Sequence, residues 1–237
     1  MKYTFVLLER VQIGSLQHIL PILLGIIFGV SLIYFAKNRC NRKQQKTIFN
    51  ALGVFISLTI IVFNIHIYSL GNYDISKDLP LFLCSFMAFI IPIYTYYRKY
   101  WMYEVLFFWI IAGTTQGIIT PDIAEGFPVF DYFRFWIVHL GLIIIMFYAT
   151  FVFNIRPQFK SIFKSIIALQ FYILIMYAVN LILSSNYSYL NAKPEAASVL
   201  DYFGEWPYYV VKAQLVIIPY CLLIYLPFYV EEIIENK

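Results

Sequence analysis

Long apolar stretches alternate with short polar breaks along the whole 237-residue chain. A helix needs about 20 predominantly apolar residues to cross the hydrocarbon core of a bilayer. Seven stretches reach that length, at residues 18–36, 48–70, 79–97, 101–120, 130–153, 162–183 and 207–230. The pattern predicts an all-α fold, a polytopic membrane bundle of seven transmembrane helices. A single transmembrane domain should cover residues 1–237, because no connection is long enough to hold a soluble domain.

The composition supports a membrane protein. Hydrophobic residues make up 62% of the chain and charged residues 13%, and the mean hydropathy is +0.75. These values lie outside the range of soluble globular domains.

Basic residues are concentrated in alternate loops, and this fixes the predicted orientation. Cytoplasmic loops retain Lys and Arg, and the stretches 37–46, 98–99 and 154–164 hold ten basic residues and no acidic one. The opposite stretches, 1–17, 71–80, 121–134 and 185–212, hold six basic and nine acidic residues. We expect an N-terminus outside and a cytoplasmic C-terminus, in a multi-pass protein of the plasma membrane.

The formal net charge of +4 is therefore a topology signal. The basic loops lie where anionic lipid headgroups meet them. Membrane lipids are the expected partners, and nucleic acid is not.

The three cysteines lie in different parts of the predicted bundle. Cys40 falls in a cytoplasmic loop, Cys84 in the outer half of the third helix and Cys221 in the middle of the seventh. An odd number of scattered cysteines argues against a disulfide framework. No metal or organic cofactor is indicated, because there is no CxxC and no pair of histidines at ligand spacing on one helix face.

Two reactive side chains, Cys84 and His139, should lie at similar depth in the outer half of the bundle. With 1.5 Å of rise per residue, they are roughly 8 and 12 Å below the outer surface. Polar side chains within a membrane normally face the bundle interior or a wet cavity, so we expect a polar pocket open toward the outer leaflet. Neighbouring helices bring further polar groups to this level: Thr114, Thr115, Gln116, Asn64 and His66.

Helical geometry orders the remaining candidates. Tyr132 lies seven positions before His139 and on nearly the same face, whereas Asp131 and Arg134 lie about 80° and 140° away. We therefore expect Tyr132 in the pocket, and Asp131 and Arg134 at its mouth. Asn64 and His66 point to nearly opposite sides, so one of them should face away.

Each reactive candidate also has a purely structural interpretation. A membrane cysteine commonly packs as a small apolar residue, which is our interpretation of Cys40 and Cys221. Cys84 is different, because Pro80 lies in the same predicted helix. Proline has no N–H to donate, so a backbone carbonyl one turn earlier would lack its hydrogen bond and favour a polar neighbourhood.

For His139, the structural alternative is a hydrogen bond to Gln116 or Tyr132. Gly25 with Gly29, and Gly113 with Gly117, are typical of helix packing notches. His18 should lie at the membrane interface.

Three segments carry a family resemblance: 79–85 (LPLFLCS), 113–122 (GTTQGIITPD) and 130–139 (FDYFRFWIVH). In these segments the chain resembles the bacterial YwaF-like integral membrane proteins, which are similar to the transmembrane protein 164 acyltransferases. The resemblance implies acyl transfer between phospholipids by a cysteine and a histidine, at the positions of Cys84 and His139. More distant relatives, the androgen-induced fatty-ester hydrolases, use a threonine with a histidine.

The implied chemistry is that of a lipid acyltransferase or lipid-ester hydrolase with an outer-leaflet pocket. Cys84 would attack an ester carbonyl after His139 takes its proton, while Gln116 with Thr114 or Thr115 would stabilise the oxyanion. One alternative is a seven-helix transporter or solute-binding membrane protein whose ligand contacts Asp131, Arg134 and Lys212. Another is a scaffold that acts through its basic loops. The catalytic hypothesis requires the thiol and the imidazole to come within hydrogen-bond reach, directly or through one bridging water.

Overall fold

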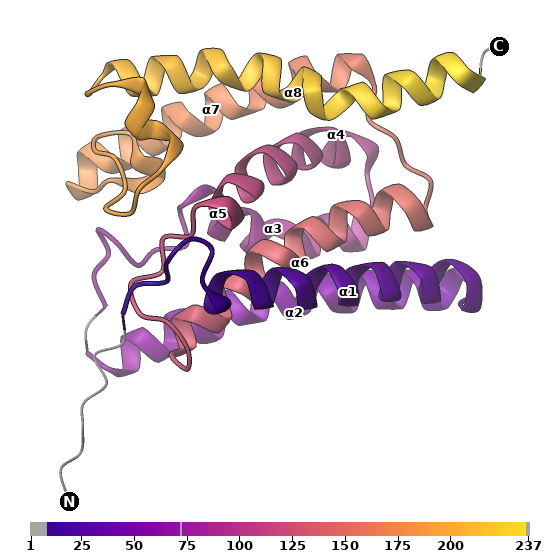
Figure 1. The fold of residues 1–237 in the computed structure, drawn as a ribbon, viewed down its shortest axis with the longest axis horizontal. Coiled ribbons are helices and arrows are strands. Elements are labelled where there is room, and N and C mark those ends of the chain that lie inside the picture. Colours follow the sequence, from indigo (N-terminus) through magenta and orange to yellow (C-terminus); the bar gives the residue numbers. More distant parts are fainter. Residues whose placement is uncertain (1–8, 72, 236–237) are drawn as a thin grey trace, which may run out of the picture.

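The computed structural model describes residues 9–71 and 73–235, and over this part of the chain the fold is helical, without strands. The helices run back and forth along one common direction (Figure 1). They are α1 (Leu16–Arg39), α2 (Arg42–Ser69), α3 (Leu83–Tyr97), α4 (Tyr100–Phe108), the π-helical η1 (Trp109–Thr114), α5 (Thr115–Ile119), α6 (Phe130–Val152), α7 (Phe159–Leu183) and α8 (Tyr208–Glu235). Two short 3-10 turns, η2 (Tyr187–Tyr189) and η3 (Val199–Phe203), lie between α7 and α8.

Six helical segments are long and apolar enough to cross a membrane: α1, α2, the continuous α4–η1–α5, α6, α7 and α8. The chain is thus a multi-pass membrane protein, as predicted. The third predicted span is the exception. Helix α3 has 15 residues, or about 22 Å of rise, which is shorter than a hydrocarbon core of about 30 Å.

The shortening of α3 has a local cause. Proline lacks a backbone N–H and disfavours helical geometry in the residue before it. Here Leu79 and Pro80 lie in a turn, where the Leu81 N–H donates to the Leu79 carbonyl at 2.7 Å. The prediction that Pro80 lies inside the helix and frees a carbonyl there is wrong, because α3 begins only at Leu83.

Helix α2 begins earlier than its apolar stretch. Its N-cap is Asn41, whose side chain accepts from the Gln44 N–H, while the Gln44 side chain accepts from the Asn41 N–H. Such a capping box satisfies two free donors of a helix start. The polar, basic residues 42–47 therefore form the first turns of α2.

Helix α6 is the centre of the bundle, and most of its residues are buried against α1, α2, α3 and η1. Helices α1, α7 and α8 lie outside and expose large apolar side chains over most of their surface. An exposed apolar helix surface of this kind is suited to lipid. Helices α7 and α8 form a pair along one side of the bundle (Figure 1).

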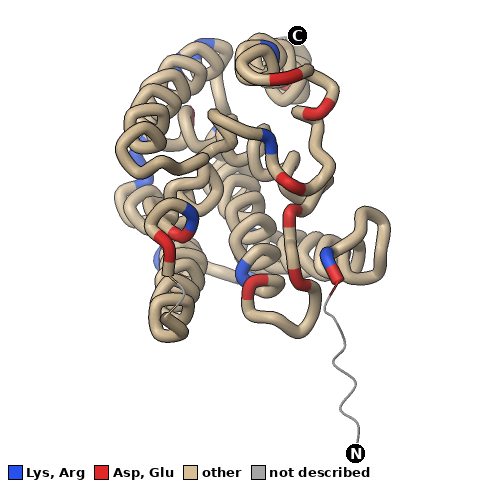
Figure 2. The backbone as a smooth tube through the Cα atoms, turned by 90° about the vertical axis from the view of Figure 1, so that its left-hand side faces the viewer, with Lys and Arg blue, Asp and Glu red and all other residues tan. Residues whose placement is uncertain are grey.

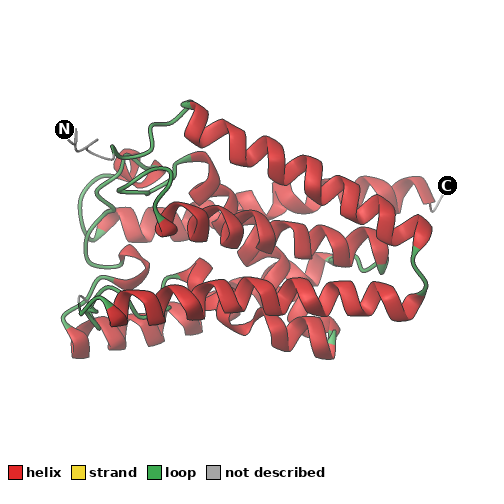
Figure 3. Ribbon diagram, turned by 90° about the horizontal axis from the view of Figure 1, so that it is seen from below, coloured by secondary structure: helices red, strands yellow, loops and turns green. Residues whose placement is uncertain are grey.

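The loops gather at the two ends of the bundle (Figures 1 and 3). Residues 9–15, 70–71, 73–82, 120–129 and 184–207 are at one end, which we call the acidic end. Figure 2 looks onto this end and shows Asp and Glu in several of its loops. The basic loops at residues 40–41, 98–99 and 153–158 are at the other end, so the loops alternate as the charge pattern predicts.

A polar network ties the helices together at the basic end. The Glu104 carboxylate in α4 is almost completely buried, and it accepts from Ser161 Oγ at 2.8 Å and from Lys164 Nζ at 2.7 Å. Arg156 forms a two-pronged ion pair with Glu231 of α8, at 3.0 and 3.1 Å. These contacts hold α7 against α4, and α8 against the α6–α7 loop.

Candidate functional site

Cys84 lies in the first turn of α3, directly after Leu83. Its side chain is half-buried, and its Sγ lies 3.8 Å from the hydroxyl oxygen of Thr114 in η1. Thr114 is completely buried. Thr114 therefore gives the thiol a polar neighbour other than the carbonyl that Pro80 was expected to free, and Cys84 lies closer to its helix start than predicted.

His139 lies in the buried face of α6, one turn after Phe135. Its Nδ1 is 2.7 Å from the Phe135 carbonyl oxygen. A carbonyl can only accept, so Nδ1 carries the hydrogen of the neutral ring, and Nε2 is left with the lone pair of a base. The ring also stacks on the Phe135 ring, with centroids 3.9 Å apart. These contacts replace the predicted hydrogen bond to Gln116 or Tyr132.

Gly117 of α5 lies against the basic side of this imidazole. A Cβ added at Gly117 would be 2.9 Å from both Nε2 and Cδ2 of His139. Gly117 therefore does more than form the packing notch predicted for it, because its lack of a side chain leaves room for the ring.

One segment thus contacts both reactive residues. Thr114 contacts Cys84 from α3, and Gly117, three positions further on, contacts His139 from α6. Residues three apart lie on the same side of a helix. Within the described part of the chain, no hydrogen bond joins the thiol directly to the imidazole, so direct contact stays a prediction.

The other predicted oxyanion donors have different surroundings. The Gln116 amide is 3.4 Å from the hydroxyl of Tyr220 in α8. Thr115 is half-buried, and its side chain makes no hydrogen bond to the described residues. Residues two positions apart differ by about 200° around a helix, so Gln116 points away from the side on which Thr114 meets Cys84.

Asn64, His66 and Tyr132 are each engaged elsewhere. Asn64 bonds the Ile60 carbonyl at 2.9 Å and the Tyr73 hydroxyl at 3.2 Å. His66 is exposed, which agrees with the prediction that one of these two faces away. The Tyr132 hydroxyl donates to the backbone carbonyl of Gln17 at 2.8 Å and so ties α6 to α1.

Asp131 and Arg134 pair with each other. Arg134 Nε donates to Asp131 at 2.6 Å, and its guanidinium lies 4.6 Å from the centroid of the Phe63 ring. Arg134 is also within electrostatic range of both the Cys84 thiol and the His139 ring.

Two tyrosines near Cys84 have no counterpart in the sequence-based prediction. Tyr172 of α7 donates to the Leu81 carbonyl at 2.7 Å, and Tyr189 bonds Asp122 at 3.3 Å. Both hydroxyls lie within electrostatic range of the thiol. Burial and the nearby Asp122 carboxylate raise the pKa of Tyr189 above its ordinary value, so its hydroxyl stays protonated. No local motif indicates that the 184–207 loop folds over this site.

His18 is the clearest correction among the histidines. It was expected at the interface, yet its side chain is buried. Its Nε2 lies 2.8 Å from the Ile118 carbonyl oxygen, and its Nδ1 accepts from the Gly14 N–H at 2.9 Å. His18 therefore fastens α1 to α5, next to Gly117.

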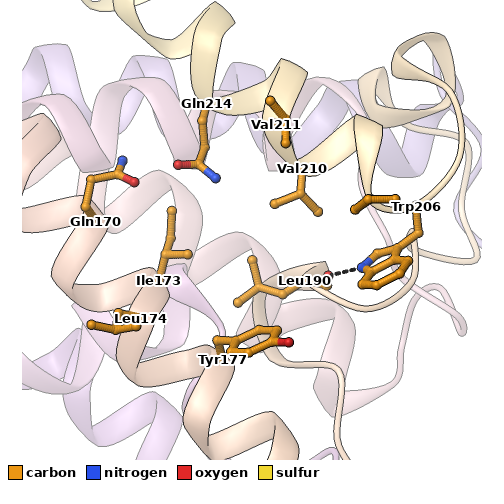
Figure 4. Close-up of a pocket in the computed structure, with 10 residues that line it drawn as sticks. Gln170, Ile173, Leu174, Tyr177, Leu190, Trp206, Val210, Val211 and Gln214 are labelled. Carbon is orange, nitrogen blue, oxygen red and sulfur yellow. Dashed lines mark hydrogen bonds between the residues drawn. The ribbon is translucent and has the colours of Figure 1, made fainter.

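Two of the cavities among the described helices lie near α7 and α8. The larger, of about 470 Å³, lies between α7 and α8 (Figure 4), and the smaller, of about 50 Å³, lies between α3, the η1 region, α7 and α8. Neither is lined by Cys84 or His139. The predicted polar pocket around this pair stays a prediction. Over residues 9–71 and 73–235, no group of three or more His, Cys, Asp or Glu side chains could hold a metal ion.

The bundle is that of an integral membrane protein, and the polar contact between Cys84 and Thr114 lies toward the acidic end of its helices. Residues 13–225 match the TMEM164 family, so the chain belongs to this family over nearly its whole length. No curated protein and no solved structure matches the chain.

Proposed function

We propose that this protein is a lipid acyltransferase or lipid-ester hydrolase that uses Cys84 as nucleophile and His139 as base. One observation carries the proposal: Thr114 holds the thiol, and Gly117 of the same segment lies against the unprotonated Nε2 of His139. Membership of the TMEM164 family supports it. So does the resemblance to acyltransferases in segments 79–85, 113–122 and 130–139.

The proposed reaction has two steps. His139 Nε2 takes the Cys84 proton, and sulfur attacks the ester carbonyl carbon of a lipid. A C–S bond forms, the ester C–O bond breaks, and the leaving lysolipid oxygen takes the proton from His139. A second lipid hydroxyl, or water, then attacks the thioester and gives its proton to His139. The C–S bond breaks, and the proton returns to the thiolate.

Thr114 is the polar side chain that contacts the thiol. Proton transfer from the thiol to His139 requires hydrogen-bond reach or one bridging water, and the Thr114 hydroxyl holds the thiol beside the segment whose Gly117 lies against the imidazole. Among the predicted oxyanion donors, Thr114 is also the best placed, because Gln116 faces Tyr220.

The acidic end of the bundle, which holds the Cys84 region, would face outward. On this proposal the N-terminus is outside, the C-terminus is cytoplasmic, and the substrate is an outer-leaflet lipid. The excess of Lys and Arg in the loops at the other end supports this orientation. The resemblance to YwaF-like proteins supports a bacterial cell membrane as the location.

The test is acyl exchange in vesicles that contain the purified protein, a phospholipid donor and a lysolipid acceptor. Cys84→Ala should lower the rate by about 10³-fold or more, as expected for loss of a nucleophile. A hydroxylamine-sensitive acyl thioester should be found on Cys84 by mass spectrometry. Cys40→Ala and Cys221→Ala are matched controls and should keep the rate. Acyl exchange at the normal rate in the Cys84→Ala protein would overturn the proposal.

The same assay separates the two enzyme classes. A transferase moves the labelled acyl chain to the lysolipid, whereas a hydrolase releases it as fatty acid. Retained function in Cys84→Ala, together with sensitivity to Asp131 and Arg134, would instead favour a transporter. The structure gives no support for that alternative, because these two charges neutralise each other.

A further inference from the structure

We propose that the turn between α1 and α2 binds the phosphate groups of anionic phospholipids in the leaflet at the basic end of the bundle. The turn consists of residues 37–46, and we call it the cationic turn. Its charges are part of the topology signal described above, and lipid binding is a second use of the same charges in the folded protein. This binding does not depend on acyl transfer by Cys84.

Four cations of the turn have no partner within the described part of the chain. Lys37, Arg39, Lys43 and Lys46 are all exposed, and none of their side chains forms a salt bridge or a hydrogen bond to a described residue. The sequence contains no Asp or Glu at residues 11–73. The turn therefore has no acidic neighbour in the sequence that could neutralise it.

The acidic side chains at this end of the bundle are engaged elsewhere. Glu104 pairs with Lys164, and Glu231 pairs with Arg156. Helix α8, which carries Glu231, lies on the opposite side of the bundle from α1 and α2 (Figure 1). At the acidic end, by contrast, four cations pair with acidic side chains of the chain itself: Arg10, Lys77, Arg134 and Lys193. The cations of the turn are thus available to an anion from outside the chain.

The backbone of the cationic turn is held firmly by hydrogen bonds. The buried Gln45 amide donates to the carbonyls of Ala36 and Cys40, at 2.9 and 3.2 Å, and so ties the start of α2 to the end of α1. The capping box of Asn41 and Gln44 adds two more bonds. Four cations are therefore displayed on a fixed piece of backbone only ten residues long.

Local helix stability does not account for these charges. Arg42 and Lys43 lie in the first turn of α2, which holds no acidic residue, and a cation near a helix N-terminus is unfavourable because the helix dipole is positive there. Lys46 lies three positions after Lys43, where side chains are neighbours on the helix surface and like charges repel. A nearby phosphate relieves both effects.

The level of the turn in the membrane favours a lipid phosphate as this anion. Exposed aromatic side chains near helix ends mark the membrane interface, and at this end they are Tyr34, Tyr97 and Trp101, each at least 60% exposed. Lys37 follows Tyr34 by three residues, or about 4.5 Å. The cations therefore lie just beyond the aromatic level. Because α1 and α2 are both membrane-spanning segments, lipid headgroups adjoin the turn that joins them.

The test is headgroup photolabelling of the full-length protein in nanodiscs that contain phosphatidylcholine and phosphatidylglycerol. Both faces of a nanodisc have the same lipids, so the effect of the cations on orientation during insertion does not enter the result. One probe is phosphatidylglycerol with a diazirine on its headgroup, the other is phosphatidylcholine with the same group, and labelled residues are mapped by mass spectrometry. The phosphatidylglycerol probe should label the cationic turn at least about fivefold more, the effect of one lysine near an anionic lipid.

Variants show whether the turn itself causes this preference. Replacing its three lysines together, by Lys37→Gln, Lys43→Gln and Lys46→Gln, should make the two probes label the turn equally. The matched control removes the same charge elsewhere, by Lys77→Gln, Lys160→Gln and Lys193→Gln, and should keep the preference. Arginine at the same three positions of the turn should also keep it, because arginine binds phosphate as well. Circular dichroism and gel filtration show that each variant is folded.

Three outcomes would overturn the proposal. Equal labelling of the turn by both probes in the natural protein would leave its cations with the topology role alone. An equal loss in the turn variant and the matched control would mean that net charge, and not the turn, attracts the lipid. Displacement of the label by a soluble acidic peptide would replace the lipid with a protein partner. Acyl exchange has no part in this test, so the proposed function and the lipid-binding turn can each fail while the other stands.

Discussion

Replacing Gly117 with alanine tests the contact between α5 and the His139 ring. The new Cβ would be 2.9 Å from Nε2 and Cδ2, whereas ordinary contact begins at about 3.4 Å. The ring must therefore move by about 0.5 Å, the difference between these two distances. It is held by the 2.7 Å hydrogen bond to the Phe135 carbonyl and by stacking on the Phe135 ring, so the movement weakens one or both contacts.

The expected effect on stability is small and the effect on catalysis is larger. Overpacking costs about 1–3 kcal/mol, and alanine regains up to about 1 kcal/mol over glycine within a helix. The net loss of stability is therefore about 0–2 kcal/mol. A displacement of 1 Å at a catalytic group can cost about 10²-fold in rate, so a movement of half that size should slow acyl transfer about tenfold.

Two other glycines provide matched controls for this variant. At Gly113, one turn earlier, a Cβ meets only the flexible end of Leu83 at 3.2 Å, so Gly113→Ala should change little. At Gly141, a Cβ meets Ile56 at 2.7 Å and has no atom of the His139 ring within 4 Å. Gly141→Ala should therefore lower stability without a specific loss of rate.

The assay pairs the acyl-transfer rate with thermal unfolding of the same preparation. Gly117→Ala should lose rate out of proportion to its loss of folded protein, and Gly141→Ala should not. If Gly117→Ala keeps the normal rate, or loses it only as far as it unfolds, the contact between Gly117 and His139 has no catalytic importance.

Two further predictions concern the packing of the bundle. Lys164→Met leaves the buried Glu104 carboxylate with only its Ser161 hydrogen bond. Because Lys164 is itself half exposed, the free energy of unfolding should fall by about 1–3 kcal/mol, less than for a fully buried pair. Adding Glu104→Met should recover part of that loss in thermal unfolding, and a double variant less stable than Lys164→Met would contradict this. His18→Leu removes the donor to the α5 carbonyl of Ile118 and should cost about 1–2 kcal/mol, with faster hydrogen exchange over residues 115–119. Equal exchange in the variant and the natural protein would show that this hydrogen bond does not hold α5.

The membrane-spanning segments could be predicted because the length of an apolar stretch is directly visible in the sequence. The third predicted span is longer than the helix α3 that the structure has. The stretch at 79–97 is predominantly apolar, but its first four residues form a turn around Pro80. Hydropathy does not distinguish an apolar turn from an apolar helix. The start of α2 shows the opposite case, in which the capping box of Asn41 and Gln44 extends a helix into polar sequence.

The candidate site could be predicted only where depth along a helix decides the neighbours. Counting residues from the ends of the helices places Cys84 and Thr114 at one depth in the bundle, and in the structure their side chains are in contact. Depth alone does not predict the direction in which Gln116 points, because the rotation of α5 depends on the π-helical segment η1 before it. Tyr189 and His18 depend on long-range folding of loops and on the packing of α1, and neither has a local sequence signal.

The π-helical segment η1 has a consequence for how this site can change. A π-helical turn holds an extra residue compared with an α-helical one, and one residue corresponds to about 100° of rotation. Deleting a single residue within Trp109–Thr114 would thus shorten the span by only about 1.5 Å. Because the extra residue is what makes this turn π-helical, its loss returns the segment to an α-helical turn, so α5 keeps its rotation relative to α4 and Gly117 stays beside His139. A second deletion in the same segment would turn α5 by about 100° and carry Gly117 away from His139. The site therefore limits the spacing between Phe108 and Thr115 more strictly than the membrane span does, and hydropathy does not record this limit.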